Sequence, residues 1–110
     1  MEEKISRLIN LVTRRTRDKS IAWSRGSSEN NFRAEFEAAI LSIELYIDEY
    51  GAYFVTLNMY NGTGDPITLA SARDGSEDFN VLWDLYVIAK DSYTKESETI
   101  DNLLKELGGF

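Results

Sequence analysis

The feature that most constrains this chain is a segment, residues 77–107, that contains neither glycine nor proline. Its apolar residues recur at alternating intervals of three and four, which is the spacing of one face of an α-helix. The members of this stripe are Phe79, Leu82, Tyr86, Ala89, Tyr93, Ile100, Leu103 and Leu107, with Glu96 as its one polar member. Ser76 before the segment is a suitable N-cap, and Gly108-Gly109 is a suitable helix end. The pattern predicts a long C-terminal helix.

A continuous helix of these 31 residues is about 46 Å long, which is more than a domain of this size can cover by itself. Either the helix projects and pairs with a second copy, or it breaks near residues 91–94 into a hairpin whose second half is capped by Thr94 or Ser97. We favour the continuous helix, and its three heptads and a little more are the shortest span over which coiled-coil pairing is a serious interpretation. Trp83 flanks the stripe, and with Phe79 and Tyr86 it builds either the core or an oligomer interface. The residues expected in an oligomer interface are Phe79, Leu82, Trp83, Tyr86, Tyr93, Ile100, Leu103 and Leu107.

The N-terminal segment predicts a second amphipathic helix, over residues 2–17. Its apolar stripe consists of Ile5, Leu8, Ile9 and Val12. Acidic residues occupy the first turn and Arg14, Arg15 and Arg17 occupy the last, so that both ends complement the helix dipole. The arginines are expected on the exposed face.

The middle of the chain favours β-strands. Ile21 and Trp23 alternate with small or polar residues and indicate a short strand, followed by a loop over residues 26–31. Residues 32–50 fit two structures: one helix with a continuous stripe, or two strands whose apolar parity reverses near Ala39. We favour strands, because the β-rich segment "AYFVTLNMY" that follows requires a pairing partner. Asn61-Gly62 indicates a tight turn, and Pro66 restricts the next strand, around "ITLAS", to an edge or its own first position.

These elements predict one α+β domain over residues 1–110. It consists of an N-terminal helix, a small antiparallel meander of three to five strands, and a long C-terminal helix packed on the sheet. Such a layout is typical of many small bacterial or phage proteins, and no motif links the chain to a named family.

Charge and composition exclude several function classes. The chain carries a net charge of -7, which divides into +4 over residues 1–33 and -11 over residues 34–110. An acidic body of this kind repels nucleic-acid backbones. Cysteine and histidine are both absent, which removes thiolate chemistry and the commonest general base and metal ligand. No apolar run is long enough to cross a membrane, and the N-terminus lacks the pattern of a signal peptide, so a cytoplasmic protein without membrane contact is expected.

Two loop motifs and the carboxylates have ordinary explanations. The glycine-rich "NGTGDP" has no lysine and does not open a helix, so it indicates a hairpin turn and not a phosphate loop. "NGT" within it matches a glycosylation sequon, which is a chance match in a protein that is not exported. The many acids fall on polar faces, with no calcium-loop spacing and no nucleophile–base pair. We expect no enzyme activity, no metal and no cofactor.

One basic stretch, "TRRTRDK" at residues 13–19, stands out in this acidic chain. It fits either of two roles: helix capping with charge pairing to the acidic remainder, within or between subunits, or a site for one phosphate-bearing ligand, since arginine binds phosphate bidentately. The candidate residues of the ligand site are Arg14, Arg15, Arg17, Trp23, Arg25 and Arg33. For Trp23 itself we favour a place in the core.

The sequence therefore predicts a small acidic binding protein that self-associates through its C-terminal helix and occupies the surface of another protein. Inhibitors, immunity proteins and adaptors fit this description, and the acidity favours a partner with a basic surface. The alternative is a protein that binds or sequesters a nucleotide or another phosphate-bearing small molecule.

Overall fold

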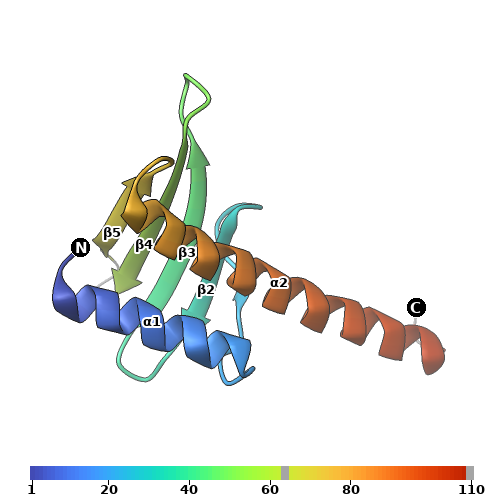
Figure 1. Cartoon of the computed structure of the whole chain (residues 1–110). Helices are drawn as coiled ribbons and strands as arrows, with labels where there is room; N and C mark the ends of the chain where they lie inside the picture. The colour runs from blue at the N-terminus through green and yellow to red at the C-terminus, as the bar shows by residue number, and fades with distance from the viewer. Residues whose placement is uncertain (63–64, 109–110) are drawn as a thin grey trace.

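The computed structural model describes residues 1–62 and 65–108 of the chain (Figure 1). An N-terminal helix comes first, five strands follow, and a long helix ends the chain. In chain order the elements are α1 (Glu3–Arg17), β1 (Ser24–Arg25), β2 (Asn31–Glu35), β3 (Ile40–Ile47), β4 (Tyr53–Tyr60), β5 (Pro66–Arg73) and α2 (Glu77–Glu106).

The N-terminal helix is confirmed and begins one residue later than expected. Glu2 is its N-cap, and the carboxylate of Glu2 accepts a hydrogen bond of 2.9 Å from the backbone N–H of Lys4. The predicted apolar stripe turns inward, with Ile9 and Val12 buried and Ile5 and Leu8 packed against the core. The three arginines of the last turn are exposed, as expected.

The five strands form one antiparallel sheet in the order β1-β2-β3-β4-β5, so that each strand pairs with its neighbours in sequence. The sheet is therefore the predicted meander, and its five strands are the upper limit of the predicted three to five. Residues 32–50 are strands and not a helix, and the parity of the apolar residues reverses in the turn at residues 36–39. The register places Phe32 opposite Ile43 and Ala34 opposite Leu41. All four side chains are buried on one face of the sheet.

The short strand that was predicted around Ile21 and Trp23 is displaced. Only Ser24 and Arg25 pair as β1, and Trp23 lies in the connection that precedes it. The Trp23 indole is 2% exposed and packs beneath α1, where its N–H donates to the hydroxyl of Thr16 at 3.0 Å. The alternation of Ile21 and Trp23 with polar residues therefore reflects burial between the helices and the sheet, and not pairing with another strand.

The hairpin of β4 and β5 follows the turn residues of the sequence. β5 is one of the two edge strands, and Pro66 is its first residue, opposite Tyr60. The edge and the first position of a strand are the places that suit a residue without a backbone N–H. Gly62 has a φ of 99°, as the predicted turn requires. Thr63 and Gly64 of the predicted turn, and with them part of the sequon match, lie outside the described residues.

The C-terminal helix α2 is continuous over its 30 residues, so the alternative of a break near residues 91–94 is wrong. Ser76 is the N-cap, and its hydroxyl accepts a hydrogen bond of 3.2 Å from the N–H of Phe79. At the other end, Leu107 is the C-cap and Gly108 has a φ of 75°, which is the usual way to end a helix. Gly109, the second glycine of the predicted helix end, lies outside the described residues.

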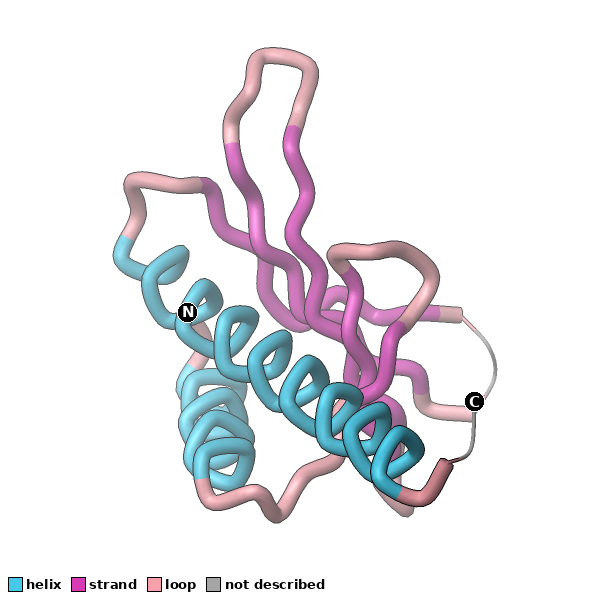
Figure 2. Tube along the Cα trace, turned by 90° about the vertical axis from the view of Figure 1, so that its right-hand side faces the viewer, coloured by secondary structure: helices cyan, strands magenta, loops and turns pink. Residues whose placement is uncertain are grey.

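Both helices cover the same face of the sheet (Figure 2). The core lies between the layers and combines Ile9 and Val12 of α1, the inward residues of β2 to β4, and the proximal part of α2. α2 then runs past the sheet and projects from the body (Figure 1). The longest dimension of the molecule is 48 Å, against 35 and 27 Å for the other two. Among the described residues, no helix lies over the opposite face of the sheet (Figure 2).

Candidate functional site

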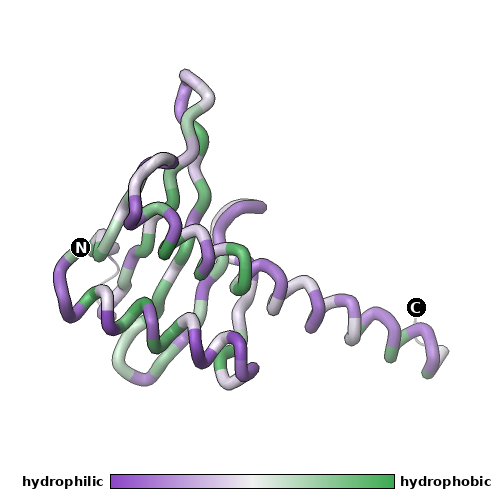
Figure 3. Tube along the Cα trace, viewed as in Figure 1, coloured by the Kyte–Doolittle hydropathy of each residue, from purple (hydrophilic) through white to green (hydrophobic). Residues whose placement is uncertain are grey.

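The most unusual surface of the molecule is the distal part of α2, which we call the α2 tail (residues 97–107). Four large apolar side chains lie on it at positions i, i+3, i+4 and i+7. They are Ile100, Leu103, Leu104 and Leu107, and they are 51%, 50%, 48% and 82% exposed. Figure 3 shows hydrophobic and hydrophilic positions alternating along this projecting segment. A helix with such a face is normally covered by another element.

The tail repeats the buried face of the same helix. Eighteen residues make five turns of an α-helix, so Ile100 lies in line with Leu82, and Leu103 lies in line with Leu85. The same offset relates Leu104 to Tyr86 and Leu107 to Ala89. The four proximal residues are Leu82, Leu85, Tyr86 and Ala89, and each is at most 2% exposed. The side of the tail that faces the same way as the buried side of α2 therefore has the composition of a core face. Within the described part of the chain, no strand lies beneath it.

Two hollows lie where α2 leaves the body, and both are lined by Ile21, Ala22, Glu96 and Ile100. The first, the α2–β2 hollow, has a volume of about 710 Å³ and includes Phe36 in its wall. The second, the α1–α2 hollow, has a volume of about 600 Å³ and includes Arg17 and Lys19. The root of the tail is thus flanked by open, partly apolar space on both sides.

The predicted oligomer interface is divided by the structure. Phe79, Leu82 and Tyr86 are buried in the core of the single chain, so they cannot meet a second copy. The physical reason is that the proximal half of α2 uses its stripe to cover the sheet. Ile100, Leu103 and Leu107 are exposed. Leu104 belongs with them, and its spacing of four residues from Ile100 was a sufficient signal to include it.

Trp83 and Tyr93 take intermediate positions at the border of the core. The Trp83 ring stacks on Phe79 with 5.7 Å between ring centroids and an interplanar angle of 18°. The Tyr93 ring lies against Phe32, with 5.6 Å between ring centroids, and the guanidinium of Arg25 lies over the Tyr93 ring, 5.5 Å from its centroid. Both side chains are partly buried against the body. Tyr93 follows Ala89, the last buried residue of α2, and so marks where the body stops covering the helix.

The six candidate ligand residues do not gather into one site. Trp23 is in the core, where its indole N–H is bonded to Thr16, so it is closed to a ligand. Arg25 is paired with Phe32 in the sheet register and lies on the helix side. Arg33 is the next residue along β2, so it points to the opposite face, where it pairs with Glu35 at 3.7 Å. Side chains alternate between the two faces along each strand, and the pairing of β1 with β2 therefore places the two arginines on opposite faces. The linear sequence did not reveal this separation.

The remaining arginines stay together at the end of α1. Arg14, Arg15 and Arg17 are exposed there, and Lys19 follows with a φ of 65°. Within the described part of the chain, neither Arg14, Arg17 nor Lys19 forms an ion pair. Two of these cations, Arg17 and Lys19, line the α1–α2 hollow. The structure thus leaves positive charge unpaired beside the root of the α2 tail.

Asp18 is the one acid within this basic end, and its ionised form is favoured. The hydroxyl of Ser20 donates to its carboxylate, and the backbone N–H of Ser20 donates to the same oxygen at 3.1 Å. The hydroxyl bond is the main cause that holds the pKa of Asp18 below its ordinary value, and the nearby charge of Arg15 acts in the same direction. Asp18 therefore keeps its negative charge at neutral pH and is already occupied by Ser20.

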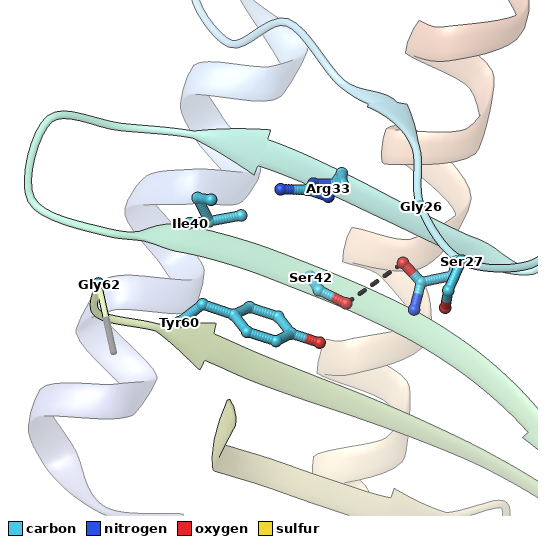
Figure 4. A pocket seen from close by; sticks show the side chains of 8 residues that line it. Gly26, Ser27, Arg33, Ile40, Ser42, Tyr60 and Gly62 are labelled. Atoms are coloured by element: carbon cyan, nitrogen blue, oxygen red, sulfur yellow. Dashed lines mark hydrogen bonds between the residues drawn. The ribbon is translucent and has the colours of Figure 1, made fainter. Parts of the chain in front are cut away.

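The uncovered face of the sheet contains a separate hollow, which we call the open-face pocket (Figure 4). It has a volume of about 360 Å³, and Arg33, Ile40, Ser42 and Tyr60 are among its lining residues. The view shows Tyr60 and Arg33 on either side of Ser42, on three adjacent strands. Such a pocket has room for a small molecule and offers it one guanidinium and one phenol.

The floor of the open-face pocket is polar, buried and hydrogen-bonded. Asn31 and Ser42 are 6% and 2% exposed. The Ser42 hydroxyl donates to Oδ1 of Asn31 at 3.3 Å, and Nδ2 of Asn31 donates to Oε2 of Glu44 at 2.8 Å. Gly26 has to be glycine here, because a Cβ would lie 1.9 Å from Oδ1 of Asn31. Nothing in the sequence pattern had singled out Asn31 or Ser42.

Two further observations concern the described residues as a whole. None of their His, Cys, Asp and Glu side chains forms a group of three or more that could hold a metal ion. Neither helix, over the same residues, includes a stretch that is long and apolar enough to span a membrane.

Comparison with known proteins identified no relative of this chain. No family model, no curated protein and no solved structure matches the chain. What the fold and the surface define is an α+β protein in which an N-terminal helix and a long C-terminal helix pack on one face of a five-stranded antiparallel sheet. The C-terminal helix of this protein ends in an uncovered apolar tail.

Proposed function

We propose that this protein is a small, non-enzymatic binding protein that acts by occupying the surface of another protein, with the α2 tail as its docking element. The observation that carries the proposal is the exposed stripe of the tail. Apolar anchors at i, i+3, i+4 and i+7 are the pattern by which amphipathic helices bind in grooves. In this chain those anchors are Ile100, Leu103, Leu104 and Leu107.

The size of the apolar contribution supports this role. Full burial of a leucine or isoleucine side chain stabilises by about 1.5–3 kcal/mol, so covering four that are half-exposed or more is worth roughly 3–6 kcal/mol. That is a substantial part of the free energy of a typical micromolar complex, about 8 kcal/mol. A partner with a hydrophobic groove is therefore expected to gain most of its affinity from these four side chains.

The charge of the protein suits a basic partner. Residues 34–110 carry a balance of -11, which speeds encounter with a positively charged surface and opposes nucleic-acid backbones. An inhibitor, an immunity protein or an adaptor would use the surface in this way. The absence of cysteine suits a reducing compartment, and the proposal places the protein in the cytoplasm.

The test is affinity capture from the source cell with the tagged full chain and two matched variants. Leu103→Glu changes an anchor of the tail, and Leu11→Glu changes a leucine of α1 that is 46% exposed. Both substitutions add one negative charge at an exposed site, where the cost to folding is usually within about 0.5 kcal/mol. A partner captured by the wild-type chain and by Leu11→Glu, and lost with Leu103→Glu, supports the proposal. Equal capture by all three chains contradicts it.

A second candidate function rests on the open-face pocket. Arg33 and the Tyr60 ring flank a polar floor, and a guanidinium in such a place suits the phosphate of a nucleotide or a similar small molecule. A panel of nucleotides should raise the melting temperature of the wild-type chain and not that of Arg33→Gln. The double variant Arg14→Ala/Arg15→Ala, at the other cluster of arginines, is the matched control. If that double variant loses the shift and Arg33→Gln keeps it, the ligand binds at the end of α1 and not in the pocket.

A further inference from the structure

We propose that the occupant of the α2 tail is the α2 tail of a second copy of this chain, bound in antiparallel orientation, with the basic end of α1 in each copy facing the acidic tail of the other. This inference rests on the proposed function of the tail as a protein-binding surface. It names the partner, the direction of pairing and the charges that fix the register. A second copy and another protein compete for the same four anchors, so the dimer is the form from which a captured partner displaces one copy.

The first step is the direction in which the tail points. Leu103 lies five turns beyond Leu85, and Ile100 lies five turns beyond Leu82, so the anchors face the side of α2 on which the sheet lies. The tail therefore overhangs the space beside the end of the sheet. A partner that covers these anchors has to occupy that space.

The second step is the exclusion of parallel pairing. If two tails met face to face and ran in the same direction, the proximal half of each helix would lie under the proximal half of the other. That volume is already filled by the sheet, against which Leu82 and Leu85 are buried to 0% exposure. In the antiparallel arrangement each body lies beyond the end of the other tail, and no overlap arises. A twofold axis through the paired tails then makes the two contacts identical.

The third step is the position of the C-terminal end of each tail in the dimer. In the antiparallel arrangement the C-terminal end of each tail reaches the root of the other, where the α1–α2 hollow and the α2–β2 hollow are open. The walls that it meets there include Ile21 and Phe36, the latter 40% exposed. The tail of 11 residues is about 16 Å long, so its apolar stripe spans the contact from one root to the other.

The fourth step is charge. Arg17 and Lys19 line the α1–α2 hollow and form no ion pair within the described part of the chain. The C-terminal end of the tail brings an acid to this place, Glu106, which is likewise outside every ion pair of the described residues. One chain thus carries both halves of a complementary pair, as an isologous interface requires.

The decisive experiment measures association of the full chain over a concentration series by sedimentation equilibrium. Wild type should form dimers. Leu103→Glu should raise the dimer dissociation constant by at least about 50-fold, because each dimer then buries the substitution twice. Leu11→Glu should leave the constant unchanged, and circular dichroism checks that each variant is folded. A wild-type chain that stays monomeric, or a Leu103→Glu chain that dimerises as tightly as wild type, overturns the inference.

Charge reversal tests the register. Arg17→Glu/Lys19→Glu and Glu106→Lys should each weaken self-association by roughly tenfold at low salt. An equimolar mixture of the two variants should form a heterodimer at close to wild-type affinity, because both charged contacts become complementary again. Failure of the mixture to associate more tightly than the separate variants contradicts the proposed pairing of α1 ends with tails.

Cysteine cross-linking tests the direction, since the natural chain has no cysteine. Antiparallel pairing places Ile100 of one copy opposite Leu107 of the other, so a mixture of Ile100→Cys and Leu107→Cys should form a mixed disulfide. Each variant alone should not, because identical positions are then too far apart for a disulfide. Efficient self-cross-linking at both positions indicates parallel pairing and overturns the inference. The proposed function is judged separately by partner capture, so a monomer that captures a partner through Leu103 would leave that function standing.

Discussion

The two halves of α2 carry the same pattern and have opposite surroundings. Leu85 and Leu103 lie in line on one face of one helix, yet the first is fully buried and the second is half-exposed. The difference arises from the sheet, which ends before the helix does. An apolar stripe in the sequence therefore predicts that one face of the helix is covered in the working protein. It does not predict which element covers that face, or whether the element belongs to the same chain.

The largest expected effect is a contrast between Leu85→Ala and Leu103→Ala. Truncating a fully buried leucine removes apolar burial and leaves a cavity, which costs about 2–5 kcal/mol of unfolding free energy. The same truncation in the tail should cost no more than about 0.5 kcal/mol in dilute monomer. Urea unfolding at low protein concentration measures both. A loss of several kcal/mol for Leu103→Ala would mean that the tail is covered within its own chain, and the comparison would fail.

A second contrast compares the same type of threonine hydrogen bond in the core and on the exposed tail. Thr16 on α1 and Thr99 on the tail each donate to the backbone carbonyl four residues earlier, at 2.7 Å and 2.8 Å. The Thr16 hydroxyl also accepts from the indole of Trp23 in the core. Thr16→Val therefore leaves a buried N–H without its acceptor, which should cost about 1–3 kcal/mol.

Thr99→Val is the matched control, because its hydroxyl is exposed to water. Its stability should stay within about 0.5 kcal/mol of wild type. Thermal unfolding of both variants compares them directly. Equal destabilisation would show that the bond to the preceding turn, and not burial of the indole, determines the loss.

A third contrast concerns Tyr86 and its counterpart in the tail, Leu104. Burial raises the pKa of Tyr86 above its ordinary value of 10.0, because the charged phenolate is poorly solvated in the core. The unfolded chain then loses its proton at lower pH than the folded chain. The stability that Tyr86 contributes is therefore complete below pH 10.0 and declines as the pH rises from there through the higher folded pKa.

Ultraviolet titration of Tyr86→Phe and Leu104→Tyr measures this effect. Tyr86→Phe should remove the late-titrating phenol and the 3.3 Å bond from its hydroxyl to Asn30, at a cost of about 0.5–1.5 kcal/mol. The phenol introduced by Leu104→Tyr should titrate near the ordinary value in dilute monomer. A raised pKa at position 104 in dilute solution would contradict the exposed state of the tail.

The sequence was sufficient to predict both helices and the longer strands, but not the short strand before them or which elements and faces pack together. The alternating three and four spacing predicted α2, and the parity reversal near Ala39 predicted the turn between β2 and β3, because both signals are local. The division of the α2 stripe at Tyr93 depends on where the sheet ends, which no helix periodicity records. Arg25 and Arg33 looked like one cluster for the same reason, since their opposite faces depend on strand pairing. The buried polar pair of Asn31 and Ser42 depends on a close approach of Gly26 that only the folded chain reveals.

The smallest expected effect lies at the basic end of α1, next to the root of the tail. Two hydrogen bonds from Ser20 and the charge of Arg15 hold the pKa of Asp18 below its ordinary value of 3.8. The stabilisation by Asp18 is therefore present above pH 3.8 and is lost as the pH falls through the lower folded pKa. In Ser20→Ala the hydroxyl bond is gone, so the pKa of Asp18 should rise toward the ordinary value, and a carboxylate-detected NMR titration measures it. Because Asp18 is exposed, global stability at neutral pH should hardly change, and a large loss would show that this end of α1 supports more of the body than its hydrogen bonds indicate.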